Sequence, residues 1–511
     1  MKQLIFLPFE CTVIVPNRFF VTLENAERCV QNEDDVTLLY CDGTSISCCW
    51  INTVCNKNLC KICNAYRKQF FHFLSKKIKC VPYASFFKKN WDDYKKLTFQ
   101  YDSIEDVKQL EYHHVKIGYA AFSSYITPTR NLLPLINNEF RNYFDQLLRT
   151  TILNTDITKE AVALFQPDQV GIFNSRFIVS RPVYEICKHN HIDVMVYETT
   201  GNAINTRRLT YFQNITPHNV TNNIKLIQQY WDSEQVTLAE KVQIAEKFYH
   251  DRKDAIQTND KVYIGNQKKD LLPDNWNFQK HNIVLLNSSE DEFASLGNEF
   301  EQNLFSSQYH ALKYIFEKYK DKDDYHFYLR VHPNLKDVPY SYHQKLYDFN
   351  KISPNITIIH ASSPVSTYAM IDHADKVIVF GSTTGMEAVY WGKPVILLAY
   401  CEYSFLDICH LPQNIEEMDA MILNKTLPVK EKLGALKVAY YRMHQEYAPM
   451  LYFPYEIKRY SFLSKSFDLY DWNKKGKIFR KTWALLLQFA GKFYRDKIIK
   501  RPLKEDLNAL T

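Results

Sequence analysis

Short runs of apolar, often β-branched residues recur along the chain and alternate with longer stretches of helical periodicity. Runs of this kind are typical of buried parallel strands, and helices between consecutive strands are typical of doubly wound sheets. The fold class expected from this pattern is α/β, with Rossmann-like domains. The predicted strands cover residues 3–7, 36–40, 169–174 and 193–198 in the first half, and 283–286, 326–331, 356–360, 376–380 and 395–399 in the second.

The pattern also predicts where the chain divides. A length of 511 residues exceeds a single ordinary core. A helix is predicted over residues 240–250, and the polar stretch 251–260 behind it reads as an inter-domain hinge. We therefore expect one Rossmann-like domain over residues 1–255, a second over 256–450, and a separate C-terminal tail over 451–511.

The segment 375–394 is the most informative part of the chain. An apolar strand is followed by a turn with two glycines, a helix from about residue 386, and a second strand after G-K-P. The backbone N–H groups at this turn, together with the hydroxyls of Ser382, Thr383 and Thr384, suit a phosphate. Glu387 lies one turn further on, where a carboxylate could hold ribose hydroxyls. The alternative is a capping box, in which Thr384 and Glu387 only satisfy backbone donors.

Several motifs in this order resemble the GT-B glycosyltransferases that build bacterial capsule and surface polysaccharides. The string S-T-T-G-M-E-A…G-K-P is similar to the nucleotide-binding helix of their C-terminal domain. The other matching strings are G-I-F-N-S-R with R-P (171–176, 181–182), N-S-S-E-D-E (287–292), Y-L-R-V-H-P-N (328–334), S-T-Y-A-M-I-D (366–372) and A-D (374–375). In the first of these, Ser175 stands where the family usually has glycine.

The resemblance implies two domains that face a cleft, with the acceptor bound on the N-terminal side and a nucleotide-sugar donor on the C-terminal side. It implies that Ser382, Thr383 and Thr384 stabilise the leaving phosphate. It adds His332 and Arg330 to that task, with Ser288 and Ser289 as a second phosphate contact. A neutral core histidine is the competing interpretation of His332. No cofactor and no metal ion are required by this architecture.

A catalytic base should come from a carboxylate that follows a strand. Glu198, which is predicted to end the strand 193–198, is the first candidate, and Asp291 occupies a similar position in the second domain. His332 completes the set of residues expected to act in catalysis, through the charge that develops on the leaving group. A carboxylate at the end of a strand is also a common helix cap, which is the alternative for both acidic residues.

Cysteine usage and the first residues indicate a cytoplasmic protein. No secretory signal and no apolar stretch of membrane-spanning length is evident, and twelve cysteines without a signal favour a reducing compartment. Nine of them precede residue 81, where Cys55, Cys60 and Cys63 could ligate zinc. A second Cys-x-x-Cys pair is missing, so buried or tolerated thiols are the favoured interpretation and no metal site is predicted.

The tail carries the basic charge of the chain. Residues 451–511 hold 14 Lys and Arg against 6 Asp and Glu, whereas the whole chain has a net charge of +6. Apolar residues between 479 and 494 recur at helical spacing among basic ones. This pattern predicts a basic amphipathic helix that binds an anionic membrane surface, or a terminal helix that packs on the domains. Charge confined to a tail does not favour nucleic-acid binding.

The favoured function is transfer of a sugar from a nucleotide-sugar donor to a growing surface polysaccharide or a lipid-linked acceptor. Two alternatives stay open at this point. One is a related phosphotransferase that uses a CDP-polyol donor, as in teichoic-acid-type polymers, and the other is a non-catalytic subunit of the assembly machinery.

Overall fold

The computed structural model divides the chain into two compact units. Unit 1 comprises residues 1–200, 204–217 and 447–504, and unit 2 comprises residues 201–203, 218–446 and 505–511. The structure describes residues 1–7, 16–43, 60, 63–64, 67–68, 71, 74–86, 91–200, 208–256, 262–297, 300, 304–444, 448–449, 453–456, 459–462, 465–468 and 504–506.

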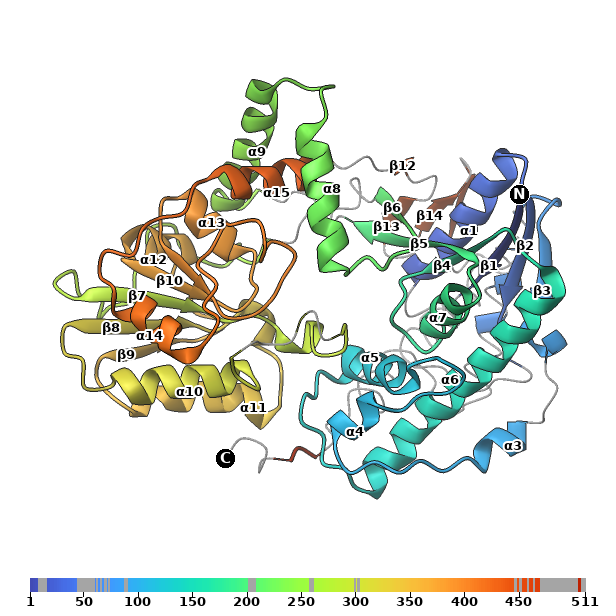
Figure 1. Ribbon diagram of the computed structural model, residues 1–511, viewed down its shortest axis with the longest axis horizontal. Coiled ribbons are helices and arrows are strands. Elements are labelled where there is room, and N and C mark those ends of the chain that lie inside the picture. Colours follow the sequence, from blue (N-terminus) through green and yellow to red (C-terminus); the bar gives the residue numbers. More distant parts are fainter. Residues whose placement is uncertain are drawn as a thin grey trace, which may run out of the picture. The chain divides into compact units, whose positions relative to one another are not determined.

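A mixed sheet of seven strands, in the order β12-β6-β5-β4-β1-β2-β3, forms unit 1 (Figure 1). The five strands β1 to β5 are parallel, and β6 and β12 add to one edge in antiparallel pairs. The first strand therefore lies in the middle, with β2 and β3 on one side and β4 and β5 on the other, which is the doubly wound order. The strands are β1 (Lys2–Phe6), β2 (Asp35–Tyr40), β3 (Lys79–Pro82), β4 (Gln169–Phe173), β5 (Asp193–Thr200), β6 (Arg208–Gln213) and β12 (Ala448–Pro449).

Helices connect these strands, and two of them begin at residues whose side chains cap them. The Asn137 side chain accepts from the backbone N–H of Phe140 at the start of α6, and Ser103 forms a capping box at the start of α4. The helices of unit 1 are α1 (Pro16–Gln31), η1 (Tyr83–Phe86), α3 (Trp91–Lys95), α4 (Ile104–Lys108), α5 (Ile117–Thr129), α6 (Asn138–Phe165) and α7 (Arg181–His189).

Unit 2 contains a fully parallel sheet of five strands in the order β11-β10-β7-β8-β9. This order again places the first strand in the middle, so the winding reverses between β7 and β10. The strands are β7 (His281–Leu286), β8 (Tyr325–Arg330), β9 (Ile356–Ile359), β10 (Lys376–Val379) and β11 (Val395–Leu397). Both units thus confirm the predicted class of doubly wound, Rossmann-like domains.

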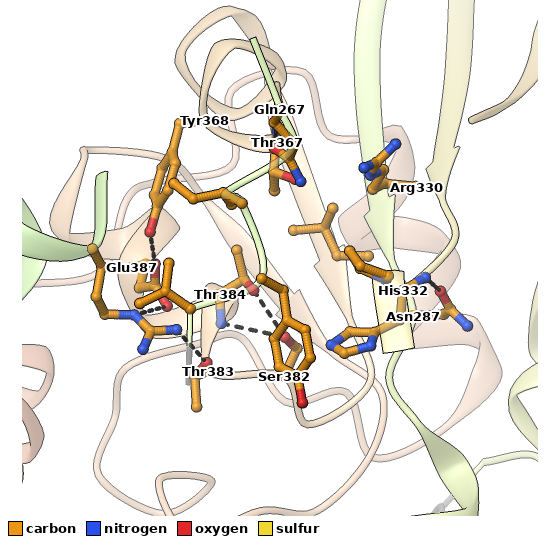
Figure 2. Close-up of a pocket in the computed structure, with 16 residues that line it drawn as sticks. Gln267, Asn287, Arg330, His332, Thr367, Tyr368, Ser382, Thr383, Thr384 and Glu387 are labelled. Carbon is orange, nitrogen blue, oxygen red and sulfur yellow. Dashed lines mark hydrogen bonds and ion pairs between the residues drawn. The ribbon is translucent and has the colours of Figure 1, made fainter. Parts of the chain in front are cut away.

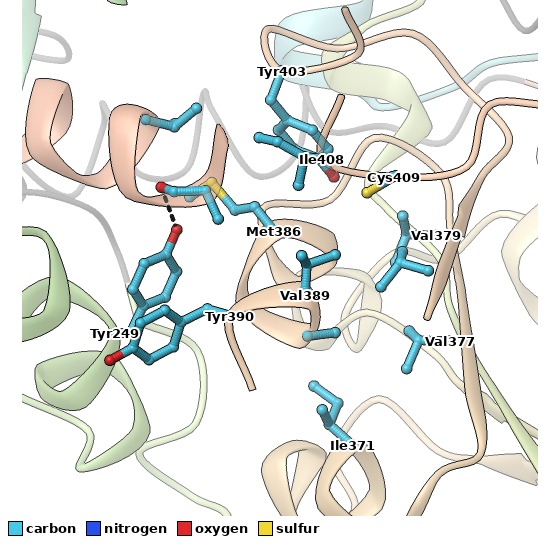
Figure 3. Packing of buried hydrophobic residues seen from close by; sticks show 14 of the residues in the cluster. Tyr249, Ile371, Val377, Val379, Met386, Val389, Tyr390, Tyr403, Ile408 and Cys409 are labelled. Carbon is cyan, nitrogen blue, oxygen red and sulfur yellow. Dashed lines mark hydrogen bonds between the residues drawn. The ribbon is translucent and has the colours of Figure 1, made fainter. Parts of the chain in front are cut away.

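Both faces of this second sheet are covered by helices, as continuous apolar strands require. Along β7, Ile283 and Leu285 pack with α10 and α14, whereas Val284 and Leu286 pack on the opposite side with α12, α13 and α15. Figure 3 shows part of this second cluster, where Val377 and Val379 of β10 lie near Ile371 of α12 and Val389 of α13. The helices of unit 2 are α8 (Val220–Asp232), α9 (Leu238–Lys253), η2 (Glu290–Glu292), α10 (Gln308–Tyr319), η4 (Pro333–Leu335), α11 (Ser341–Gln344), η5 (Lys345–Lys351), α12 (Thr367–His373), α13 (Thr384–Tyr390), α14 (Ile415–Leu423) and α15 (Leu433–His444).

The predicted domain boundary at residue 255 differs from this division. Helices α8 and α9 belong to unit 2, where Trp231 and Phe248 lie in the same buried cluster as α13 and α15. The stretch 251–260, which was expected to be a hinge, begins inside α9. The sequence pattern identified the helix correctly but could not indicate which sheet its apolar side covers.

Part of the tail is β structure. Strands β13 (Phe453–Glu456), β14 (Arg459–Phe462) and β15 (Lys465–Asp468) form an antiparallel sheet, so the prediction of a helical tail is wrong for these residues. The helix expected between 479 and 494 lies outside the described residues. Within the described part of the chain, we find no helix that combines the length and hydropathy needed to cross a membrane.

Candidate functional site

A pocket opens in unit 2 at the carboxyl ends of β7, β8 and β10. This position is the point where the winding of the sheet reverses, and ligands of open α/β sheets bind in the crevice at such a point. Figure 2 shows the polar side chains that face it. The lining residues come from α9, the segment 262–267 before β7, α12, α13 and the residues at and after the ends of these strands: Arg252, Val262, Tyr263, Ile264, Gln267, Leu286, Asn287, Arg330, His332, Pro333, Thr367, Tyr368, Ser382, Thr383, Thr384 and Glu387.

Three consecutive hydroxyl residues enter the pocket where the chain leaves β10. Gly381 has φ of 78°, a conformation that glycine adopts without a steric penalty, and it turns the chain toward α13. The hydroxyls of Ser382 and Thr384 are 2.9 Å apart, and the backbone N–H of Thr384 donates to Ser382 Oγ at 3.3 Å. Thr383 is the N-cap residue of α13, yet its side chain makes no capping hydrogen bond. The structure thus brings all three predicted hydroxyls together.

Glu387 is buried at the edge of the pocket, with 2% of its surface exposed. Its Oε1 accepts from Nε of Arg252 at 2.9 Å, and its Oε2 accepts from the hydroxyl of Tyr368. The capping-box interpretation is wrong, because α13 has Thr383 rather than Thr384 as its N-cap and Glu387 bonds to side chains of other helices. The carboxylate is instead one member of a buried ion pair.

Arg330 and His332 lie at the end of β8. Arg330 Nη1 and Nη2 donate to the backbone carbonyls of His360 and Ser363 at 2.9 and 3.0 Å, and burial lowers the pKa of the guanidinium to about 10. His332 Nδ1 accepts from the backbone N–H of Asn334 at 3.2 Å, so the ring proton of the neutral form lies on Nε2. Both side chains line the pocket, although two donors of Arg330 are used to brace the loop after β9.

Ser288, Ser289 and Asp291 follow β7 but are not among the residues that line the pocket. Ser288 exchanges hydrogen bonds with the side chain of Gln308, and Ser289 Oγ accepts from Nδ2 of Asn334 at 3.1 Å. Asp291 lies in the short helix η2 and is buried. The structure therefore places these three residues beside the pocket rather than in it.

The part of the chain that carries most of the pocket also matches a known protein family. Residues 277–410 match the protein family described as "Capsule polysaccharide biosynthesis protein". This match confirms the predicted resemblance over the segment that carries β7, β8, β10 and α13. No curated protein matches the chain.

Two solved structures are similar to larger parts of the chain. The β-Kdo 2,4 transferase KpsC of Thermosulfurimonas dismutans is 14% identical, with a TM-score of 0.35, and the match covers 54% of this chain and 79% of KpsC. The UDP-GlcNAc 2-epimerase of Methanocaldococcus jannaschii is 12% identical, with a TM-score of 0.23, over 86% of this chain and 98% of the epimerase. At these TM-scores, the likeness says nothing about the activity of this chain.

Glu198, the first candidate for a base, lies in unit 1. It is inside β5, which runs on to Thr200, and it is paired with Thr210 of β6, so its predicted position at the end of a strand is wrong. Its Oε2 accepts from Nδ2 of Asn174 at 2.6 Å. Asn174 follows β4 with φ of 46°. The role of Glu198 as a base stays a prediction.

Sequence reasoning missed several polar residues of the pocket. Tyr368 lies in the S-T-Y-A-M-I-D string, so a signal for it existed, but no role was assigned to it. Arg252 lies in the stretch that was interpreted as a hinge, and nothing in its surroundings in the sequence marks it. Among the described residues, no group of three or more His, Cys, Asp or Glu side chains is placed to hold a metal ion. Cys55 of the zinc alternative lies outside that part of the chain.

Proposed function

We propose that this protein is a glycosyltransferase of capsule polysaccharide biosynthesis that uses a nucleotide-sugar donor. The observation that supports this most is the pocket itself. It lies where the winding of the sheet reverses between β7 and β10, and it gathers hydroxyl, guanidinium and imidazole groups. Eleven of its sixteen lining residues fall within the segment 277–410 that matches the capsule family. The acceptor in this proposal is the growing polysaccharide or a lipid-linked glycan.

The phosphate groups of the donor would be held at the start of α13. Ser382, Thr383 and Thr384 supply hydroxyl and backbone N–H donors, and His332 supplies its Nε2 proton across the pocket. Negative charge increases on the leaving phosphate as the bond to the sugar breaks, so donors that are already fixed in place stabilise the transition state more than the ground state. This chemistry requires no metal ion, which is part of the proposal.

The ribose would be held by Glu387. A carboxylate whose two oxygens already accept from Arg252 and Tyr368 still has lone pairs for hydroxyl groups of a ligand. On the acceptor side, we retain Glu198 as the proposed general base, which would remove the proton of the attacking hydroxyl. Its hydrogen bond from Asn174 would hold the carboxylate in one orientation.

Ligand-induced stabilisation tests this proposal. Incubation with UDP-, GDP-, CMP- and CDP-linked donors should raise the melting temperature with one nucleotide class. A donor at about one hundred times its Kd stabilises the folded protein by about 2.7 kcal/mol. A product assay with the stabilising donor and an oligosaccharide acceptor then tests transfer. Stabilisation by CDP-polyols alone would support the phosphotransferase instead, and no stabilisation by any donor would contradict the proposal.

We further propose that the basic tail holds the enzyme at the anionic inner face of the cell membrane, where lipid-linked acceptors are found. Each Lys or Arg near such a surface contributes roughly 1 kcal/mol. A variant that ends at residue 470 keeps β13–β15 and should no longer sediment with vesicles rich in anionic lipid. The intact chain should sediment with them, and less so at high salt, because exposed charges are screened. If the intact chain ignores the vesicles, the tail does not bind membranes.

A further inference from the structure

Helix α9 contributes an arginine to the candidate donor pocket. Arg252, next to the C-terminal residue of the helix, has 8% of its surface exposed and lines the pocket. Its Nε donates to Glu387 Oε1 at 2.9 Å, and its Nη2 donates to Thr383 Oγ1 at 3.4 Å. One planar guanidinium therefore holds two groups of α13 and its N-cap, Glu387 and Thr383, which are labelled in Figure 2. Both belong to the proposed contacts with the nucleotide.

A second side chain fixes the same carboxylate from another helix. Tyr368 of α12 donates its hydroxyl to Glu387 Oε2. Burial and the neighbouring Glu387 raise the pKa of Tyr368, so its hydroxyl keeps its proton and remains a donor. Helices α9 and α12 thus determine the orientation of a carboxylate on α13. A carboxylate this deeply buried requires such compensation.

The two arginines of the pocket have different tasks. Arg330 donates through Nη1 and Nη2 to backbone carbonyls, so it braces a loop. Arg252 donates to side chains that themselves face the pocket. A lysine could not replace it in this task, because a single ammonium lacks the rigid fork that reaches a carboxylate and a hydroxyl together.

We propose that Arg252 is a positioning residue of the donor site, which acts on the nucleotide through Glu387 and Thr383. This inference rests on the proposed function and deepens it, since it makes nucleotide affinity depend on a residue of α9 that lies far from the donor-binding motif in the sequence. The competing interpretation is a buried ion pair that only stabilises the fold.

Nucleotide affinity per folded molecule separates these two interpretations. The variants are Arg252→Lys, which keeps the positive charge, and Arg252→Gln, which removes it. The matched control is Lys253→Gln, because Lys253 is the next residue of α9 and pairs at the surface with Asp372 at 2.7 Å, outside the pocket lining. The probe is UDP, GDP, CMP or CDP, whichever stabilises the parent protein most, titrated at a temperature where melting curves show every variant folded.

We expect both Arg252 variants to bind this nucleotide about tenfold more weakly than the parent, and the control to remain within about twofold. On a Glu387→Gln background, Arg252→Gln should add no more than about a further twofold, because only the longer hydrogen bond to Thr383 then remains to be lost. If Arg252→Gln does not fold, the nucleotide affinity of Arg252→Lys still distinguishes a positioning role from a purely structural one.

Three results would overturn the inference. Arg252 variants that melt at lower temperature but bind within twofold of the parent would make the ion pair purely structural. Arg252 variants that lose affinity while Glu387→Gln keeps it would mean that Arg252 does not act through the carboxylate. If the parent protein binds none of the four nucleotides, the proposed function is contradicted, and this inference, which rests on it, is contradicted as well.

Discussion

Replacing Glu387 with glutamine should destabilise the protein by about 3 kcal/mol and also weaken nucleotide binding. The loss of stability arises because the substitution leaves the buried guanidinium of Arg252 without a carboxylate, and breaking a buried ion pair on one side is costly. A residue that merely capped a helix would cost about 0.5–2 kcal/mol and leave the affinity unchanged. Denaturant unfolding gives the first quantity, and nucleotide titration of the folded variant gives the second.

The control for this substitution is Asp372→Asn, which breaks the partly exposed pair between Asp372 and Lys253. Pairs of that kind contribute at most about 1 kcal/mol, so the control should unfold close to the parent. An outcome in which Glu387→Gln loses stability but binds the nucleotide as tightly as the parent would remove Glu387 from the ribose site. The carboxylate would then be a structural element of the junction between α9, α12 and α13.

All five strands of the unit 2 sheet and four of the seven in unit 1 could be predicted from the sequence, because buried parallel strands leave a direct signal. Strands β3, β6 and β12 of unit 1 were not predicted. Every residue of β8 and β10 is buried, and most of them are apolar, although β8 also contains His326 and Arg330 and β10 begins with Lys376. The turn after β10 was equally visible, since Gly381, the hydroxyl residues and Gly385 are adjacent in the chain. The position of the pocket follows from these local features together with the order of the strands.

Contacts between distant segments could not be predicted in the same way. Arg252 and Glu387 are 135 residues apart, and no periodicity links them. Lys376 begins an apolar strand, yet its Nζ is enclosed by the carbonyls of Met421, Ile422 and Asn424 at the end of α14. Helices α8 and α9 have apolar sides whose partner sheet is a matter of tertiary packing. The domain boundary and the ion pair of the pocket could therefore be identified only from the structure.

The end of β5, the strand that carries Glu198, could not be predicted from the sequence either. This strand was predicted to end where polar residues begin, but an antiparallel neighbour, β6, extends the pairing to Thr200. Polar residues are accepted at such an edge because only one side of the sheet must be apolar there. A pattern of apolar residues locates the buried part of a strand and not its full length.

Replacing Gly385 with alanine should test how closely α13 approaches β10. A Cβ atom at this position would lie 2.6 Å from Oη of Tyr403 and 2.8 Å from Cγ2 of Val379, and both neighbours are buried. The hydroxyl of Tyr403 donates to the carbonyl of Ser382, so a displaced Tyr403 also displaces the first hydroxyl residue of the pocket. We expect a net loss of about 2 kcal/mol and roughly tenfold weaker nucleotide binding.

Helix propensity and the steric conflict change the free energy of unfolding of Gly385→Ala in opposite directions, so the sign of the measured change shows which effect is larger. Alanine is favoured over glycine inside a helix by up to about 1 kcal/mol, so without the steric conflict the variant would be more stable than the parent. The control is Gly265→Ala, because a Cβ atom there meets nothing within 4 Å. If Gly385→Ala unfolds at the same denaturant concentration as the parent and binds the nucleotide equally well, the start of α13 has room to move. The donor site would then not depend on the contact between Gly385, Tyr403 and Val379.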